Sequence, residues 1–169
     1  YNTYGTDLAD KMIDYSIGNL NWLQEELPNS FENLKWNVEQ ADATNHNWDF
    51  SNIKYQISNI AVATETYLGT PLSSLPDREK LTQIIDEANQ IAEGFFSNVA
   101  PQLKKGTRLC VALPAWHLGN GKFAHLKTLD HLTDLGYTRL DLKYASKEDL
   151  IYHRPDQVVA RELTILEKL

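Results

Sequence analysis

Hydrophobic residues recur at helical spacing in two long stretches of the chain. In residues 12–26, apolar side chains return every three or four positions, and Pro28 follows the stretch. Residues 76–99 open with a proline and two acidic residues, which suit a first helical turn, and apolar side chains keep the same spacing to the end. Two amphipathic helices are therefore predicted. A sparser repeat over residues 123–135, followed by Gly136, predicts a third helix.

Short apolar runs alternate with these helices and predict strands. The four that come first are residues 2–6, 34–39, 59–64 and 108–113. The last two of them are continuous apolar runs, which are typical of strands buried on both faces of a sheet. Strands that alternate with helices favour a parallel α/β sheet with right-handed crossovers. Near the C-terminus, two further runs without a helix between them predict an antiparallel hairpin: residues 139–144 and 158–166.

The composition suits one globular domain spanning residues 1–169. The chain has 169 residues, 42% of them hydrophobic and 23% charged, which is enough for one sizeable core. It contains no apolar stretch near the roughly 20 residues that cross a membrane, and its first residues lack the pattern of a signal peptide. We therefore expect a cytoplasmic protein. The single cysteine, Cys110, excludes an internal disulfide and is expected to be buried as a small apolar residue.

The charge is unevenly distributed along the chain. The net charge is −7, with nine acidic residues against two lysines in residues 1–50 and fourteen charges of each sign in residues 51–169. This distribution does not form a broad nucleic-acid-binding face. An RNA substrate would therefore need phosphate contacts from an additional domain or a partner. The five histidines form no close metal-ligand pair along the sequence, so no metal site is predicted.

Acidic residues follow three of the predicted strands. Asp7 comes after the first strand, Asp42 with Ala43 after the second, and Glu65 after the third. Open α/β sheets bind ligands at the carboxyl ends of their strands, so the three carboxylates are predicted to line a single cleft. Each aspartate also has a structural interpretation. Asp7 could cap the helix that follows it, and Asp42 could form a loop turn.

The segment Val62-Ala63-Thr64-Glu65-Thr66-Tyr67-Leu68-Gly69 resembles a known motif. It is similar to the Asp/Asn-Pro-Pro-Tyr/Phe motif of amino-methyltransferases, and closest to the Thr-Glu-Pro-Tyr-Leu-Gly variant in relatives of THUMP-associated tRNA guanine N2-methyltransferases. Residues 158–166 resemble the closing strand of that group. The resemblance implies a Rossmann-like class I methyltransferase sheet that ends in an antiparallel hairpin. Thr66 departs from the motif, because the proline expected there would restrict φ and stiffen the loop.

The resemblance also implies a cofactor and roles for the acidic residues. The cofactor of the family is S-adenosylmethionine. Asp7 stands where the family places a carboxylate that accepts hydrogen bonds from the two ribose hydroxyls. Asp42, followed by Ala43, stands where an acidic or amide side chain contacts the adenine amino group. These three residues are the predicted cofactor-binding set.

The predicted catalytic residues are Glu65, Thr66 and Tyr67. In the family, this loop holds an exocyclic amino group of a nucleic-acid base, and the resemblance favours guanine N2 in tRNA. The Glu65 carboxylate and the Thr66 carbonyl would accept hydrogen bonds from the amine, and Tyr67 would stack on a base taken out of its helix. Two other interpretations are open: a non-catalytic methyltransferase-like scaffold or RNA-positioning subunit, and a DNA amino-methyltransferase.

The first strand of this class, with its glycine-rich turn, has no counterpart in the chain. We therefore expect a catalytic domain that is incomplete at its N-terminus and lacks the first strand of its sheet. A gap is expected between the strands at 2–6 and 60–64, to be filled by upstream residues or by a second chain. Such a chain alone is not expected to bind the cofactor tightly.

Two pairs of neighbouring residues have both a functional and a structural interpretation. Trp116 and His117 follow the strand at residues 108–113 and could line a substrate pocket, although packing is the simpler role for the tryptophan. Arg161 and Glu162 lie in the last strand. They are interpreted as an edge-strand ion pair or as solvated charges.

Overall fold

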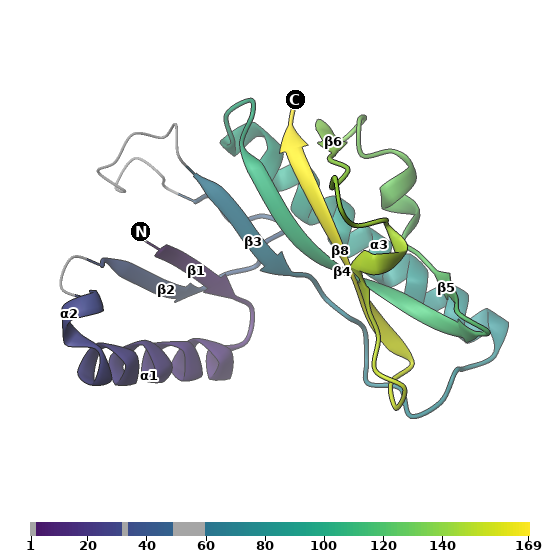
Figure 1. The fold of residues 1–169 in the computed structure, drawn as a ribbon, viewed down its shortest axis with the longest axis horizontal. Coiled ribbons are helices and arrows are strands. Elements are labelled where there is room, and N and C mark those ends of the chain that lie inside the picture. Colours follow the sequence, from purple (N-terminus) through teal and green to yellow (C-terminus); the bar gives the residue numbers. More distant parts are fainter. Residues whose placement is uncertain (1–2, 32–33, 49–59) are drawn as a thin grey trace. The chain divides into compact units, whose positions relative to one another are not determined.

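The computed structural model describes residues 3–31, 34–48 and 60–169 (Figure 1). The chain divides into two compact units, Tyr1–Tyr55 and Gln56–Leu169. Each unit combines helices with strands, as the alternating pattern predicts, so the fold class is α/β. None of the helices in the described ranges is long and apolar enough to cross a membrane.

The first unit is a pair of parallel strands with one long helix against them. Its elements in chain order are β1 (Thr3–Asp7), α1 (Asp10–Glu26), α2 (Pro28–Phe31) and β2 (Trp36–Gln40). Gly5 lies opposite Val38 in the parallel ladder. Ile13 of α1 is buried, and it lines the same hollow as these two strand residues. The predicted helix at 12–26 is confirmed. Asn2, the first residue of the first predicted strand, lies outside the described residues.

The second unit contains a mixed six-stranded sheet. Its strands are β3 (Ala61–Glu65), β4 (Arg108–Gly119), β5 (Lys122–Ala124), β6 (Tyr137–Arg139), β7 (Ile151–Tyr152) and β8 (Val159–Lys168). Its helices are α3 (Arg78–Val99) and the short 3₁₀ helices η2 (Ala100–Gln102), η3 (Lys127–Asp130) and η4 (Glu148–Leu150). The main path of the sheet is β3-β4-β8-β6, with β5 paired to β4 and β7 paired to β8. β3 and β4 are parallel, whereas β8 is antiparallel to β4, β6 and β7.

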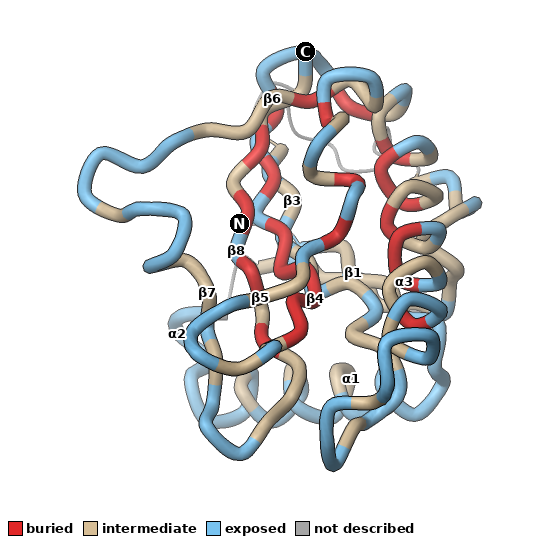
Figure 2. The backbone as a smooth tube through the Cα atoms, turned by 90° about the vertical axis from the view of Figure 1, so that its right-hand side faces the viewer, coloured by how far each residue is buried: buried red, intermediate tan, exposed pale blue. Residues whose placement is uncertain are grey.

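The core of the second unit lies between its sheet and α3 (Figure 2). Alternate residues of β4 and one side of α3 supply it: Leu109, Val111, Leu113, Ala115, Ala88, Ala92 and Phe96. The Tyr137 hydroxyl donates a hydrogen bond to the Phe96 carbonyl oxygen at 3.0 Å, and burial raises the pKa of this hydroxyl well above its usual range. The predicted helix at 76–99 is confirmed. Because side chains alternate along a strand, this packing also determines which β4 residues point away from α3.

The sheet face that points away from α3 is more exposed than the sequence predicts. Cys110, expected to be buried, is exposed, because it alternates with the β4 residues that face the helix. In β3, Ala61, Ala63 and Glu65 are exposed in the same alternating pattern. The strands predicted at residues 59–64 and 108–113 were expected to be buried on both faces, and this is wrong for the described residues. Asn59, the first residue of the strand predicted at 59–64, lies outside the described residues.

The helix predicted over residues 123–135 is wrong. The chain instead turns back from β4 into β5 at Asn120 and Gly121, whose φ angles are 52° and 71°. An Asn-Gly pair with positive φ angles is the preferred two-residue hairpin turn, and this local signal overrides the sparse leucine repeat. After β5, the Thr128 amide and hydroxyl both donate to the Asn89 side-chain oxygen of α3, at 3.1 and 2.9 Å. The Asn89 side chain thus gives the Thr128 amide the acceptor that a backbone carbonyl would supply in an α-helix.

The described strands belong to two separate hydrogen-bonded sheets. Among them, β1 pairs with β2 alone, and β3 pairs with β4 alone. No described strand therefore pairs with the second edge of either β1 or β3. The expectation that upstream residues or a second chain complete the sheet stays a prediction.

Candidate active site

Glu65 at the end of β3 is held by an arginine from a distant part of the chain. Its Oε1 accepts a hydrogen bond from Arg161 Nε at 2.5 Å. Arg161 belongs to β8, and β4 lies between the two strands. Both side chains are partly exposed, at 49% for Glu65 and 31% for Arg161. A carboxylate has about four lone-pair sites, so Glu65 keeps acceptor capacity beyond this bond. Arg161 therefore orients this carboxylate, which can still accept a further hydrogen bond.

Thr66 ties the loop after β3 to the neighbouring strand. Its backbone amide donates to the Ala112 carbonyl oxygen at 3.0 Å, and its hydroxyl donates to the same oxygen at 3.2 Å. A proline could make neither bond, because it has no amide hydrogen and no hydroxyl. The residue expected to loosen the loop thus anchors it by hydrogen bonds. Gly69, with a φ of 86°, supplies the left-handed turn a few residues later.

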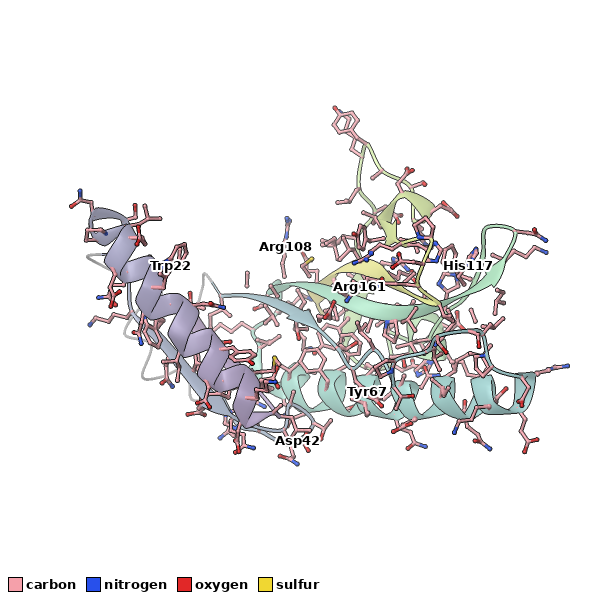
Figure 3. All side chains as sticks on the ribbon, turned by 90° about the horizontal axis from the view of Figure 1, so that it is seen from below. Trp22, Asp42, Tyr67, Arg108, His117 and Arg161 are labelled. Atoms are coloured by element: carbon pink, nitrogen blue, oxygen red, sulfur yellow. The ribbon has the colours of Figure 1, made fainter. Side chains whose placement is uncertain are left out.

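Tyr67 follows this anchored position. Its side chain is 37% exposed and is one of the exposed large hydrophobic residues (Figure 3). A ring at the end of a strand can also serve in packing alone. The exposure is compatible with a ring that stacks on a ligand, since an aromatic face remains accessible.

The two aspartates lie together at one edge of the β1–β2 sheet. Asp7 is opposite Gln40 in the parallel ladder, and the Ala41 amide donates to the Asp7 carbonyl oxygen at 2.9 Å. Ala41 therefore begins the loop beside the end of β1, and Asp42 follows it. Glu65 ends a strand of the other sheet, so the single cleft expected for all three carboxylates stays a prediction.

The described contacts of both aspartates are local. Asp7 Oδ1 accepts a hydrogen bond from the Ala9 amide at 2.8 Å, just before α1. Asp42 Oδ1 accepts from the Thr44 amide at 2.9 Å and from the Thr44 hydroxyl at 2.7 Å, and its Oδ2 accepts from Asn45 Nδ2 at 3.2 Å. These bonds, the one from the Thr44 hydroxyl above all, lower the pKa of Asp42. Asp42 thus organises the loop that also carries Ala43.

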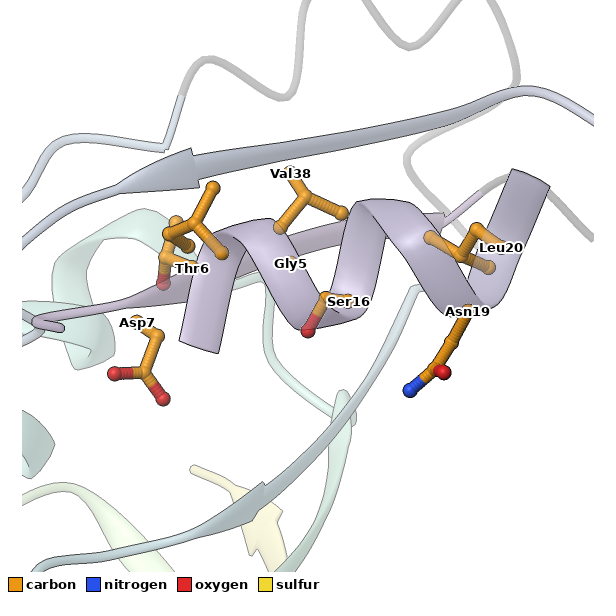
Figure 4. A pocket seen from close by; sticks show the side chains of 8 residues that line it. Gly5, Thr6, Asp7, Ser16, Asn19, Leu20 and Val38 are labelled. Carbon is orange, nitrogen blue, oxygen red and sulfur yellow. The ribbon is translucent and has the colours of Figure 1, made fainter. Parts of the chain in front are cut away.

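A hollow beside Asp7 lies between α1 and the two strands (Figure 4). Its volume is about 370 Å³, and its polar side chains include Ser16 and Asn19 from α1. On the strands, the hollow is lined by Gly5 and Val38. Asp7 fits a ribose-containing cofactor, because it offers an acceptor-only carboxylate at a strand end beside a concave surface. Asp42 and Ala43 do not belong to the residues that line this hollow, and the cofactor contact expected of them stays a prediction.

The structure decides between the functional and structural interpretations of Trp116. It also shows the ion-pair partners of Arg161 and Glu162. Trp116 is fully buried, as expected for a packing residue. Arg161 and Glu162 do not pair with each other. Glu162 is 3% exposed, and its carboxylate lies 3.0 Å from Arg139 Nη2 and 2.5 Å from His125 Nδ1. The role of Arg161 was missed, because its carboxylate partner lies 96 positions earlier in the chain.

The known proteins that match this chain are distant from it in sequence. No family model matches the chain. Over 147 residues, it is 26% identical to an Hsp70 nucleotide exchange factor of Gibberella zeae, and the match covers 72% of this chain and 69% of that protein.

Two solved structures also align with the chain. A SAM-dependent methyltransferase from Methanosarcina mazei has a TM-score of 0.46 and 14% identity, with 100% of this chain and 82% of that one covered. A Clostridium thermocellum protein described as an rRNA-methylase has a TM-score of 0.43 and 13% identity, with 98% and 74% covered. Both TM-scores are below 0.5, so the function is inferred from the chain's own residues.

Proposed function

We propose that this chain is the catalytic part of an S-adenosylmethionine-dependent methyltransferase that acts on an exocyclic amino group of a nucleic-acid base. The observation that carries the proposal is the loop after β3. Arg161 holds the Glu65 carboxylate at 2.5 Å, and the next residue, Thr66, is anchored to Ala112. A fixed acceptor beside an anchored backbone and a partly exposed Tyr67 is the arrangement needed to hold a planar amine.

The residues of the chain would contribute alignment and acceptors. S-adenosylmethionine, when bound, supplies a methyl group on a sulfonium centre. Asp7 and Asp42 would hold its ribose and adenine from the ends of β1 and β2. Methyl transfer is an in-line displacement, so catalysis depends on positioning and on electrostatic stabilisation.

An exocyclic amine is a weak nucleophile, because its lone pair is delocalised into the ring. Two acceptors would hold its N–H groups: the Glu65 carboxylate and the Thr66 carbonyl oxygen. Hydrogen bonds to them would orient the amine and draw its lone pair toward the methyl group. Tyr67 would stack on the target base.

The finer assignment is guanine N2 in tRNA. It rests on the resemblance of the segment from Glu65 to Gly69 to the motif of that group. The net charge of −7 supports a further element of the proposal, namely that an additional domain or partner supplies most phosphate contacts. Upstream residues or a second chain would complete the sheet.

The decisive experiment compares two glutamates in the protein that carries this chain at its natural length. Methyl transfer from labelled S-adenosylmethionine to a tRNA transcript is followed by nucleoside mass spectrometry. Glu65→Gln should lower turnover about 10²-fold or more, by analogy with a lost oxyanion-hole donor, with cofactor affinity unchanged. Glu167→Gln is the matched control, because Glu167 pairs with Arg108 on the same sheet. Equal activity of the two variants would refute the role of Glu65.

A non-catalytic scaffold is the second candidate. The hydrogen bonds of Asp42 within its own loop favour it, because they give this carboxylate a structural role without any cofactor. Calorimetric titration of the natural-length protein with S-adenosylmethionine separates the two candidates. Tight binding supports the enzyme, and absence of binding supports the scaffold. The same assay with a DNA substrate tests the third alternative, since methylated DNA and unmodified tRNA would identify a DNA amino-methyltransferase.

A further inference from the structure

Three of the five histidines of the chain gather around one phenylalanine in the second unit. Phe123 of β5 has its ring centroid 5.2 Å from that of His117, 5.5 Å from that of His153 and 6.5 Å from that of His125. The rings of His117 and His153 are 4.4 Å apart with an interplanar angle of 35°, so they are partly stacked. The four rings come from the end of β4, from β5 and its following residue, and from the segment after β7.

The fold fixes these rings from outside the cluster. His153 Nε2 lies 2.8 Å from the Gln157 carbonyl oxygen. His125 Nδ1 lies 2.5 Å from the buried Glu162 carboxylate. His117 and Phe123 are partners in the β4–β5 hairpin. The rings are therefore preorganised, and a ligand that stacks on them would not have to order them first.

The cluster is accessible rather than part of the core. The side chain of His125 is 41% exposed, and His117, Phe123 and His153 are each partly exposed. In the same unit, the core aromatic residues Phe96, Trp116 and Tyr137 are fully buried. Aromatic rings that the fold orders but leaves at the surface are a common feature of recognition sites.

The cluster lies beyond the same end of the sheet as Glu65. Glu65 is opposite Ala112 in the parallel β3–β4 ladder, and β4 continues from there to His117 and on into the hairpin. Five residues of a strand span about 17 Å. The rings of His117 and Phe123 therefore stand farther along the direction in which β3 ends, on the face of the sheet that carries Glu162 and opposite the face of Glu65.

The chemistry of the cluster favours stacking over metal binding. Within the described part of the chain, no group of three or more histidine, cysteine, aspartate or glutamate side chains could hold a metal ion. Imidazole and phenyl rings offer flat faces, and RNA-binding proteins recognise unpaired bases by stacking them on phenylalanine, tyrosine, tryptophan and histidine.

We propose that His117, Phe123 and His153 form a platform on which unpaired bases of an RNA substrate stack. This platform rests on the proposed function for the identity of its ligand, and it adds a substrate contact remote from the reacting amine. Its affinity comes from ring faces, so it operates in a chain whose net charge is −7.

The test is direct RNA binding, measured without methyl transfer. Fluorescence anisotropy follows a labelled single-stranded RNA of mixed sequence, titrated with the full chain in the absence of cofactor. Phe123→Leu keeps the apolar volume and removes the aromatic face, and His153→Ala removes a second ring. Each should weaken binding about tenfold, the size expected for one lost stacking contact. His131→Ala is the matched control, because His131 is similarly exposed, at 38%, but pairs with Glu93 on α3.

The outcomes separate this inference from the proposed function. Unchanged affinity of both platform variants, an equal loss in His131→Ala, or no RNA binding by the wild-type chain would each overturn the platform. Circular dichroism verifies that each variant is folded, and His153→Ala decides the question if Phe123→Leu is not. Loss of RNA affinity in the platform variants together with an inactive wild-type enzyme would leave the platform standing and reject the methyltransferase. Glu65→Gln should bind the RNA like the wild type.

Discussion

Arg161 and Glu162 are adjacent in β8, yet they form ion pairs on opposite faces of the sheet. Arg161 bonds to Glu65 at the end of β3, where both partners are partly exposed. Glu162 is buried between Arg139 and His125. Successive side chains of a strand point to opposite faces, so two neighbouring charges with opposite signs cannot pair with each other in β8. One ion pair thus belongs to the candidate active site, and the other belongs to the core.

Arg161 is expected to act as a positioning residue for Glu65. Arg161→Gln should lower kcat about tenfold to 10²-fold with little change in cofactor affinity, because a catalytic group displaced by about 1 Å can lose this much rate. Arg161→Lys should recover part of the activity. Arg108→Gln, which breaks the 3.8 Å pair with Glu167, is the control. Steady-state kinetics decide the point, and a change confined to KM would contradict it.

Glu162 is expected to contribute more to the stability of the fold than Glu167 does. Glu162→Ala leaves Arg139 without its carboxylate in a site where Glu162 is 3% exposed. Breaking a buried pair from one side costs about 3–5 kcal/mol, which urea denaturation can measure. Glu167→Ala removes a partly exposed pair and should cost less than about 1 kcal/mol. Similar unfolding free energies for the two variants would show that the Glu162 cluster contributes no more than a surface pair.

Thr66→Pro tests how the loop after β3 is fixed. The proline found in related motifs would remove both hydrogen bonds to the Ala112 carbonyl oxygen. An unmade hydrogen bond at a partly buried site costs about 1–3 kcal/mol, so thermal unfolding should occur at a lower temperature. Thr66→Ser keeps both donors and should resemble the wild type. A higher Tm for Thr66→Pro would mean that restriction of φ matters more than these bonds.

The loop after β2 should be sensitive to acid through Asp42. Hydrogen bonds from Thr44 hold the pKa of this carboxyl below its ordinary value of 3.8. A group whose pKa is lowered by folding stabilises the folded loop above its ordinary pKa, and this contribution is lost as the pH falls through the folded value. NMR titration of the carboxyl carbon should show a midpoint below 3.8 that Thr44→Ala raises. Thr82→Ala, which removes a hydroxyl bonded within α3, should leave the midpoint unchanged.

The sequence by itself determined the long helices and the placement of acidic residues after strands. The spacing of apolar residues in α1 and α3 is a local signal, because one face of each helix must be apolar whatever it packs against. Asp7, Asp42 and Glu65 were located after strands by the same local reading. The Asn120-Gly121 turn was also visible in the sequence, and giving it more weight than the leucine repeat would have predicted β5.

Only the tertiary structure decided which side chains meet and which face of the sheet is covered. The Glu65–Arg161 contact joins positions 96 residues apart, and the ring cluster joins β5 to the segment after β7. Cys110 lies in an apolar run, yet it is exposed because α3 covers the other face. Strand pairing and helix placement are long-range choices that depend on the packing of the whole unit, and the local pattern of residues does not encode them.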